Sequence, residues 1–176
     1  VPGIGIELRG EDDEPVPPGT PGRLWIRSGS NTSGYWRRKE LTEDVVRGEW
    51  LRMGDTLEER DGRYVYVGRA DDMFKVDGGW VSGTQVEAAL LEHPAVAEAG
   101  VVSRPDGRGL ARTSAAIVLE SGADEPATEE LRHLVSAGVG EHASPRMVSV
   151  RSELPRVASG KINRRALREE PDTAWA

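Results

Sequence analysis

The chain has 176 residues, of which 37% are hydrophobic and 30% charged, a composition typical of a folded globular protein. Acidic residues outnumber Lys and Arg by 30 to 23, and the net charge of −7 argues against bulk electrostatic binding to nucleic acid or to an anionic membrane. No cysteine is present, which excludes disulfides, thiolate metal sites and cysteine nucleophiles. No apolar run has the length of a membrane span, and the opening VPGIGIELRG has neither an initiator Met nor the pattern of a signal peptide. We therefore expect a cytoplasmic enzyme, and a fragment of a longer protein.

Residues 1–70 predict short strands joined by turns. Apolar and small or polar residues alternate over 4–8, as on a half-buried strand. Two further segments, 23–27 (RLWIR) and 64–67 (YVYV), also predict strands, and Asp61-Gly62 predicts a hairpin turn before the second. This β-rich part contains only fragments of a core, so we expect it to be the end of a larger domain.

The pattern changes near residue 70, within GRADD (68–72). Ser82 and Gln85 fit a capping box that starts a helix over 84–92. The elements expected next are strands over 95–103 and 112–120, a helix that ends at Gly138, a strand over 147–150 and a helix over 162–169. This order predicts an α+β fold, with a small domain of about 100 residues after the boundary.

Lys161 directly follows Ser159-Gly160 in a segment that predicts a loop before a helix. A P-loop would need a glycine five residues before Gly160 and a Ser or Thr after the lysine. Pro155 and Ile162 occupy these positions, so the segment is not a P-loop. By itself, Lys161 is most simply a solvated surface charge.

The other candidates also have simple structural interpretations. Asp71-Asp72 could hold a metal ion, but adjacent carboxylates at a strand end more often form a turn or a cap. Gly78-Gly79 is most simply the tip of a hairpin. The basic residues near the C-terminus are most simply the solvated face of a helix, and the histidines at 93, 133 and 142 lack carboxylates at ligand spacing. No metal site is predicted.

Together these motifs resemble one family. GDTLEERDGRYVYVGRADDMFKVDGGWVSGTQVE (54–87) and LPRVASGKINRRAL (154–167) resemble the C-terminal third of the AMP-forming adenylating enzymes, which include acyl- and aryl-CoA synthetases, luciferases and nonribosomal-peptide adenylation domains. GEWLRMGD and YVYVGRADDMFKV are most similar to benzoate-type CoA ligases. The resemblance implies that 1–70 is the last subdomain of a large domain and that 71–176 is a mobile lid.

The resemblance also implies roles for single residues. Asp55 matches an aspartate that accepts hydrogen bonds from the ATP ribose hydroxyls, and Arg69 matches an arginine on the ribose and phosphate side. Asp71 matches the hinge of the lid, and Gly78-Gly79 matches a hairpin that lines the pantetheine tunnel for CoA. Lys161 matches the lysine that bridges the carboxylate substrate and ATP during adenylation.

Some features depart from the family or are missing. Trp80 stands where many members have a polar residue, and Gly83 replaces a common proline. Glu87 matches an acidic residue that we interpret as structural. The phosphate loop, the carboxylate pocket and the Mg²⁺ ligands are expected in a missing N-terminal domain, so the chain alone is expected to be inactive.

The function expected from the resemblance is that of an ATP-dependent carboxylate–CoA ligase for an aryl acid, with no nucleic-acid or membrane partner. Two alternatives stay open. The chain could belong to an adenylation domain that loads a carrier protein, or it could be a stand-alone, non-catalytic lid or interaction module.

Overall fold

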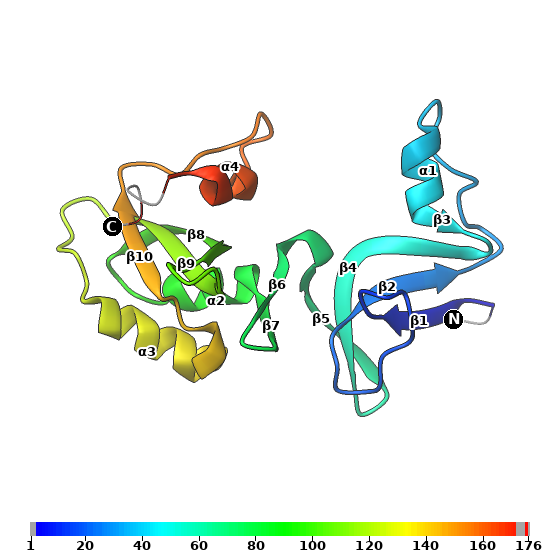
Figure 1. Cartoon of the computed structure of the whole chain (residues 1–176), viewed down its shortest axis with the longest axis horizontal. Helices are drawn as coiled ribbons and strands as arrows, with labels where there is room; N and C mark the ends of the chain where they lie inside the picture. Colours follow the sequence, from blue (N-terminus) through cyan, green and yellow to red (C-terminus); the bar gives the residue numbers. More distant parts are fainter. Residues whose placement is uncertain (1–2, 172–174, 176) are drawn as a thin grey trace. The chain divides into compact units, whose positions relative to one another are not determined.

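The computed structural model describes residues 3–171 and 175, and the chain divides into two compact units. Unit 1 comprises Val1–Asp71 and unit 2 comprises Asp72–Ala176. Each unit has its own sheets, so each is described by itself (Figure 1).

Unit 1 is built on an antiparallel five-stranded sheet with one short helix. Its elements are β1 (Gly5–Arg9), β2 (Gly22–Arg27), α1 (Lys39–Val45), β3 (Val46–Arg47), β4 (Trp50–Arg60) and β5 (Arg63–Arg69). The strands run in the order β1-β2-β4-β3, and β5 pairs with β4. The predicted turn between β4 and β5 is confirmed, because Asp61 and Gly62 both have positive φ, at 51° and 70°.

The core of unit 1 is thin. Among its described residues, the buried apolar side chains are those of Leu8 and Trp25. Arg9 lies 4.5 Å from the centroid of the Trp25 ring and 5.1 Å from that of Trp50, so a cation–π stack covers part of the sheet. Large apolar side chains of β5, such as Tyr66 at 57% exposure, stay accessible.

Unit 2 contains two layers of helices around a three-stranded sheet, preceded by a hairpin. Its elements after the 3₁₀ helix η1 (Ala70–Asp72) are β6 (Met73–Val76), β7 (Gly79–Ser82), α2 (Gly83–Leu90), β8 (Val96–Pro105), β9 (Ala111–Leu119), α3 (Thr128–Gly138), η2 (Glu141–Ala143), β10 (Met147–Arg151) and α4 (Arg164–Glu169). In the sheet, β9 lies between β8, which is antiparallel to it, and β10, which is parallel to it.

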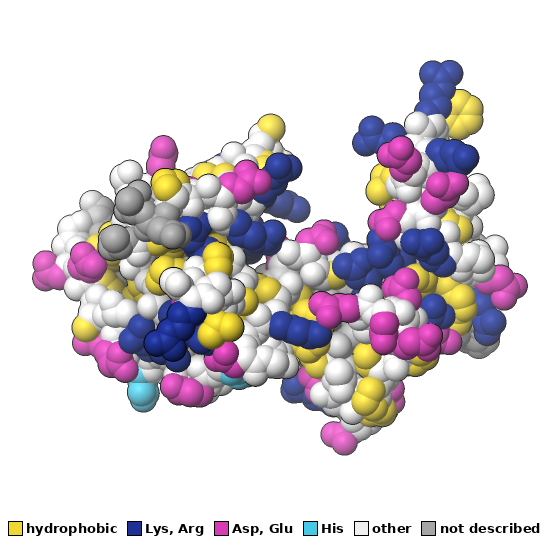
Figure 2. Space-filling model, viewed as in Figure 1, with side chains coloured by type: hydrophobic (Ala, Val, Ile, Leu, Met, Phe, Trp, Pro, Cys, Tyr) yellow, Lys and Arg dark blue, Asp and Glu magenta, His cyan; other side chains and the backbone are white. Residues whose placement is uncertain are grey.

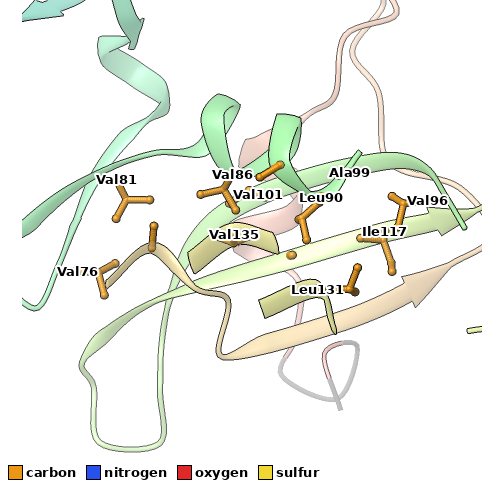
Figure 3. Packing of buried hydrophobic residues seen from close by; sticks show 13 residues of the cluster. Val76, Val81, Val86, Leu90, Val96, Ala99, Val101, Ile117, Leu131 and Val135 are labelled. Atoms are coloured by element: carbon orange, nitrogen blue, oxygen red, sulfur yellow. The ribbon is translucent and has the colours of Figure 1, made fainter. Parts of the chain in front are cut away.

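The main core of unit 2 lies between the sheet, the β6–β7 hairpin and the helices α2 and α3. Figure 3 shows Val86 and Leu90 of α2, Ile117 of β9 and Leu131 and Val135 of α3 turned toward one another. All five side chains are fully buried. The capping-box prediction is confirmed for the N-cap, because the Ser82 hydroxyl accepts a hydrogen bond from the Gln85 amide at 3.4 Å.

A second apolar cluster is formed by other buried side chains of the same sheet together with residues from the C-terminal part of the chain. It joins Val102 and Ala116 to Leu167 of α4 and to Trp175. Arg104 is 4% exposed and donates to the carbonyl oxygens of Leu167, Arg168 and Glu170 at 2.7–3.0 Å. A buried guanidinium therefore satisfies the carbonyls at the end of α4 and holds this helix on the sheet.

The α+β fold predicted from the sequence is confirmed. Helix α1 is not predicted from the sequence, because it has no buried residue and no side-chain N-cap and so lacks the apolar periodicity that predicts a helix. The predicted hairpin turn implies a strand before Asp61, but the full extent of β4 is not predicted, because polar and charged residues interrupt its apolar pattern. Across residues 3–171 and 175, no helix is long and apolar enough to cross a membrane.

Limited proteolysis with proteinase K should cut the native chain first near 68–75 or within the loop at 11–22. The loop is rich in exposed residues, and 68–75 contains the boundary between the units, whereas β8 and β9 are largely buried. Mass spectrometry of the earliest fragments would locate the cuts, and the urea-unfolded chain serves as the control. Early cleavage inside β8 or β9 would contradict this assignment.

Candidate active site

Asp55 and Arg69 lie opposite each other on β4 and β5. They are direct partners in the strand register, and Arg69 Nη1 donates to Asp55 Oδ1 at 3.2 Å. Their side chains are 35% and 53% exposed. A carboxylate can accept several hydrogen bonds and a guanidinium can donate five, so this pair can bind a further polar ligand such as a diol or a phosphate.

Gly54 makes room for this pair. A Cβ atom at this position would overlap the guanidinium of Arg69. The space beside Gly54 is occupied by the end of the Arg69 side chain, a contact that the sequence pattern did not reveal. Gly54 therefore leaves room for the guanidinium of the Asp55–Arg69 pair.

Lys161 lies on a closed hairpin between β10 and α4. An isolated antiparallel bridge joins Arg156 to Ile162, and the Val157 amide donates to the Lys161 carbonyl at 2.9 Å. The Gly160 amide donates to the Val157 carbonyl at 2.9 Å, with Gly160 at φ +83°. The lysine follows this turn and is exposed. In the described part of the chain, its ammonium has no ion-pair partner, which leaves it available to an anion.

An ion pair holds the start of α4, three residues after Lys161. Arg164 donates to both carboxylate oxygens of Glu87, at 2.6 and 3.2 Å, and lies 3.6 Å from Asp72. Glu87 also accepts the Val101 amide at 2.9 Å. Burial raises the pKa of Glu87, and the Val101 N–H and the charge of Arg164 oppose this rise.

The turn between β6 and β7 consists of Asp77 and Gly78, which have φ of 50° and 84°. Both carboxylate oxygens of Asp77 accept from Arg112 at 2.6 Å, which ties the turn to β9. Gly79 belongs to β7, and a Cβ there would meet the His142 ring at 2.8 Å. The sequence placed the tip at Gly78-Gly79; the structure moves the turn back by one residue.

The remaining candidates occupy separate places in the chain. Asp71 lies in η1 and is the last residue of unit 1, next to Asp72 of unit 2. Within unit 2, the loop before α4 lies at the top of Figure 1, and the β6–β7 turn lies on the lower side, near the end of α3. Unit 2 therefore presents Lys161 and the Gly78 turn on opposite sides.

Basic side chains gather at the loop before α4 and over this helix. Figure 2 shows Lys and Arg side chains over the loop before α4 and over α4 itself. Several are tied to carboxylates, such as Arg165 to Glu169 at 2.8 Å. Four long-range contacts of unit 2 were not predicted from the sequence, because the partners are far apart along the chain. They are the contacts of Arg112 with Asp77, Arg156 with Glu98, Arg164 with Glu87, and His142 with the Trp80 carbonyl.

Residues 85–161 match the family model of the AMP-binding enzyme C-terminal domain. The chain is 39% identical to a 4-hydroxybenzoate–CoA/benzoate–CoA ligase of Rhodopseudomonas palustris over 173 residues, which cover 96% of this chain and 32% of the relative. It superposes on a benzoate CoA ligase from Burkholderia xenovorans with a TM-score of 0.75 at 41% identity, covering 96% of this chain and 34% of the other. It also superposes on o-succinylbenzoate coenzyme A synthetase from Bacillus subtilis, in complex with ATP and magnesium ion, with a TM-score of 0.78 at 26% identity, covering 95% and 34%.

Residues 85–161 therefore form the C-terminal domain of an AMP-binding enzyme, and the chain as a whole is similar to the C-terminal portion of AMP-forming aryl-CoA ligases. It is 39–41% identical to these benzoate-type aryl-CoA ligases and corresponds to their C-terminal portion, as the sequence motifs predicted. It spans about a third of the length of the relatives that it matches.

Glu87→Ala should lower the free energy of unfolding by about 3 kcal/mol, because it leaves Arg164 without its main partner and the Val101 N–H without its acceptor. Urea denaturation followed by circular dichroism would measure the change. Glu169→Ala is the matched control, since it breaks the exposed pair with Arg165 and should leave the free energy of unfolding nearly unchanged. Equal effects of the two substitutions would show that the Glu87 pair is not a structural anchor.

Proposed function

We propose that the longer protein containing this chain is an ATP-dependent, AMP-forming carboxylate–CoA ligase that acts on an aryl acid. The observation that carries the proposal is an exposed Lys161, without an ion-pair partner in the described chain, on a closed hairpin in the C-terminal domain of this family. The similarity to benzoate ligases supports the aryl class of the acid.

The reaction has two steps. A substrate carboxylate oxygen attacks the α-phosphorus of ATP, which forms the acyl-adenylate and releases pyrophosphate. The CoA thiol then attacks the acyl carbon, which forms the thioester and releases AMP. We assign Asp55 to accept hydrogen bonds from the ribose diol and Arg69 to donate to the ribose and phosphate side. Their accessible, oppositely charged pair on β4 and β5 supports this assignment.

Lys161 acts in the first step. A carboxylate and a triphosphate repel each other, and a compact ammonium between them offsets this repulsion and stabilises the charge that develops as the bond forms. Bound Mg²⁺ would supply further positive charge to the phosphates. Mg²⁺ in such sites is usually held by substrate phosphates and one or two carboxylates, and we assign its protein ligands to the N-terminal domain.

The second step needs Lys161 to leave. We infer that unit 2 rotates about Asp71 after adenylation and brings the Gly78-Gly79 side to the reaction centre, where it lines the pantetheine channel. Two observations support this inference: the chain divides next to Asp71, and the two functional loops lie on opposite sides of unit 2 (Figure 1).

Unit 1 is then the last subdomain of the large domain. Its thin core and its accessible β5 side chains support this assignment, because the rest of that domain would bury them. The large domain also supplies the phosphate loop and the carboxylate pocket, and the chain by itself is inactive.

Lys161→Ala in the full-length enzyme should slow adenylate formation by about 10²–10³, the usual effect of removing one well-placed charge contact. Pyrophosphate exchange measures this step, and thioester release from a synthetic aryl-adenylate, which should be unchanged, measures the second. Lys39→Ala, which removes an exposed lysine on α1, is the control. If Lys161→Ala slowed both steps equally, Lys161 would be structural and the two-state lid would be wrong.

Gly78→Leu should have the opposite effect, with thioester formation slowed and adenylation kept. Nothing lies within 4 Å of a Cβ built on Gly78, so the added side chain points away from the domain and into the proposed channel. Gly78→Ala is the control, because it carries the same strain at φ +84° without the bulk. A KM for CoA that rises equally in both variants would assign the effect to strain in the turn.

A further inference from the structure

The hairpin that carries Lys161 is closed by its own backbone but is exposed at its tip. The bridge between Arg156 and Ile162 closes its base, and residues 156–161 are all exposed. A lysine on such a loop samples many positions unless the loop is anchored to the domain. Adenylation, as proposed above, needs the ammonium at one position between two anions.

The side chain of Arg156 provides an anchor. Its Nη1 donates to the Gly160 carbonyl at 2.7 Å, and its Nη2 donates to Glu98 Oε2 at 2.6 Å. Glu98 lies on β8, so one guanidinium joins the turn of the hairpin to the central sheet.

The carbonyl group that accepts from Arg156 on the hairpin directly precedes Lys161. The Gly160 carbonyl belongs to the planar peptide unit that connects Gly160 to Lys161, so a bond to this oxygen orients the plane from which the Lys161 Cα departs. Gly160 is also the residue with positive φ, where the backbone has most freedom. Arg156 therefore restrains the torsions immediately before the lysine.

We propose that Arg156 is a positioning residue for Lys161 in the adenylation step, acting through the Gly160 carbonyl and anchored by Glu98. The inference rests on the proposed function. The side chains of Arg156 and Glu98 are 45% and 38% exposed, and exposed ion pairs add little to stability. Removing Arg156 is therefore expected to change the reaction and not the fold.

The test uses the full-length enzyme. Arg156→Ala should lower kcat for pyrophosphate exchange about tenfold, because a small displacement of a catalytic group has effects of this order, and thioester release from a synthetic aryl-adenylate should stay within about twofold. The melting temperature should not change. Arg156→Lys should recover part of the loss, since a single ammonium does not reproduce the fork that reaches two acceptors. Arg165→Ala, which breaks another exposed pair on α4, is the matched control and should behave like the wild type.

A double-mutant cycle tests the anchor. Glu98→Ala should slow adenylation in the same direction, and the double variant should be no slower than Arg156→Ala, because both substitutions break one connection. Hydrogen exchange followed by mass spectrometry provides a readout besides activity. Peptides covering 155–163 should exchange faster in Arg156→Ala, and those covering β8 and β9 should not.

Three results would overturn the inference. The first is an Arg156→Ala enzyme that adenylates like the wild type. The second is a loss of both half-reactions with faster exchange throughout unit 2, which would make Arg156 structural. The third is a wild-type enzyme that forms no adenylate, or an undiminished Lys161→Ala variant; that result removes the proposed function itself, and so is distinguishable from the first two.

Discussion

The ion pair between Glu87 and Arg164 is the constraint on which the second unit depends. Glu87 is 8% exposed, and a buried carboxylate is tolerated only with partners. It has two, the Val101 amide on β8 and the guanidinium of Arg164 at the start of α4. One side chain of α2 thereby fixes the sheet and the helix that follows the Lys161 hairpin. The position of the exposed lysine depends on a contact made in the interior.

The sheet of unit 2 contributes buried side chains to two separate apolar clusters. The larger cluster packs α2, α3 and the β6–β7 hairpin, and the smaller one packs α4 and Trp175. Because the sheet is common to both, the Gly78 turn and the Lys161 hairpin are held on one rigid body at opposite sides (Figure 1). A domain built in this way can present either loop by turning as a whole, without rearranging its core.

Much of the fold could be predicted from local patterns in the sequence. Ser82 and Gln85 predicted the start of α2, Asp61-Gly62 predicted the turn between β4 and β5, and alternating apolar residues predicted β1. Elements without an apolar face, such as α1, could not be predicted. Hydrophobic periodicity reflects which residues are buried, and α1 has no buried residue. The candidate residues came from resemblance to a family; taken singly, Lys161 and Gly78 indicated only a surface charge and a turn.

The sequence by itself determined the α+β class, the change of pattern near residue 70 and the family, because these are written in residues close together along the chain. Only the tertiary structure decided which charges meet. Arg164 pairs with Glu87 across 77 residues of sequence, and Arg156 pairs with Glu98 across 58. The guanidinium of Arg69 occupies the space that a side chain at Gly54 would fill. Such contacts leave no periodic signal, since any of several exposed arginines and carboxylates could pair on composition alone. The folding of β8, α2 and α4 onto one another selects among them.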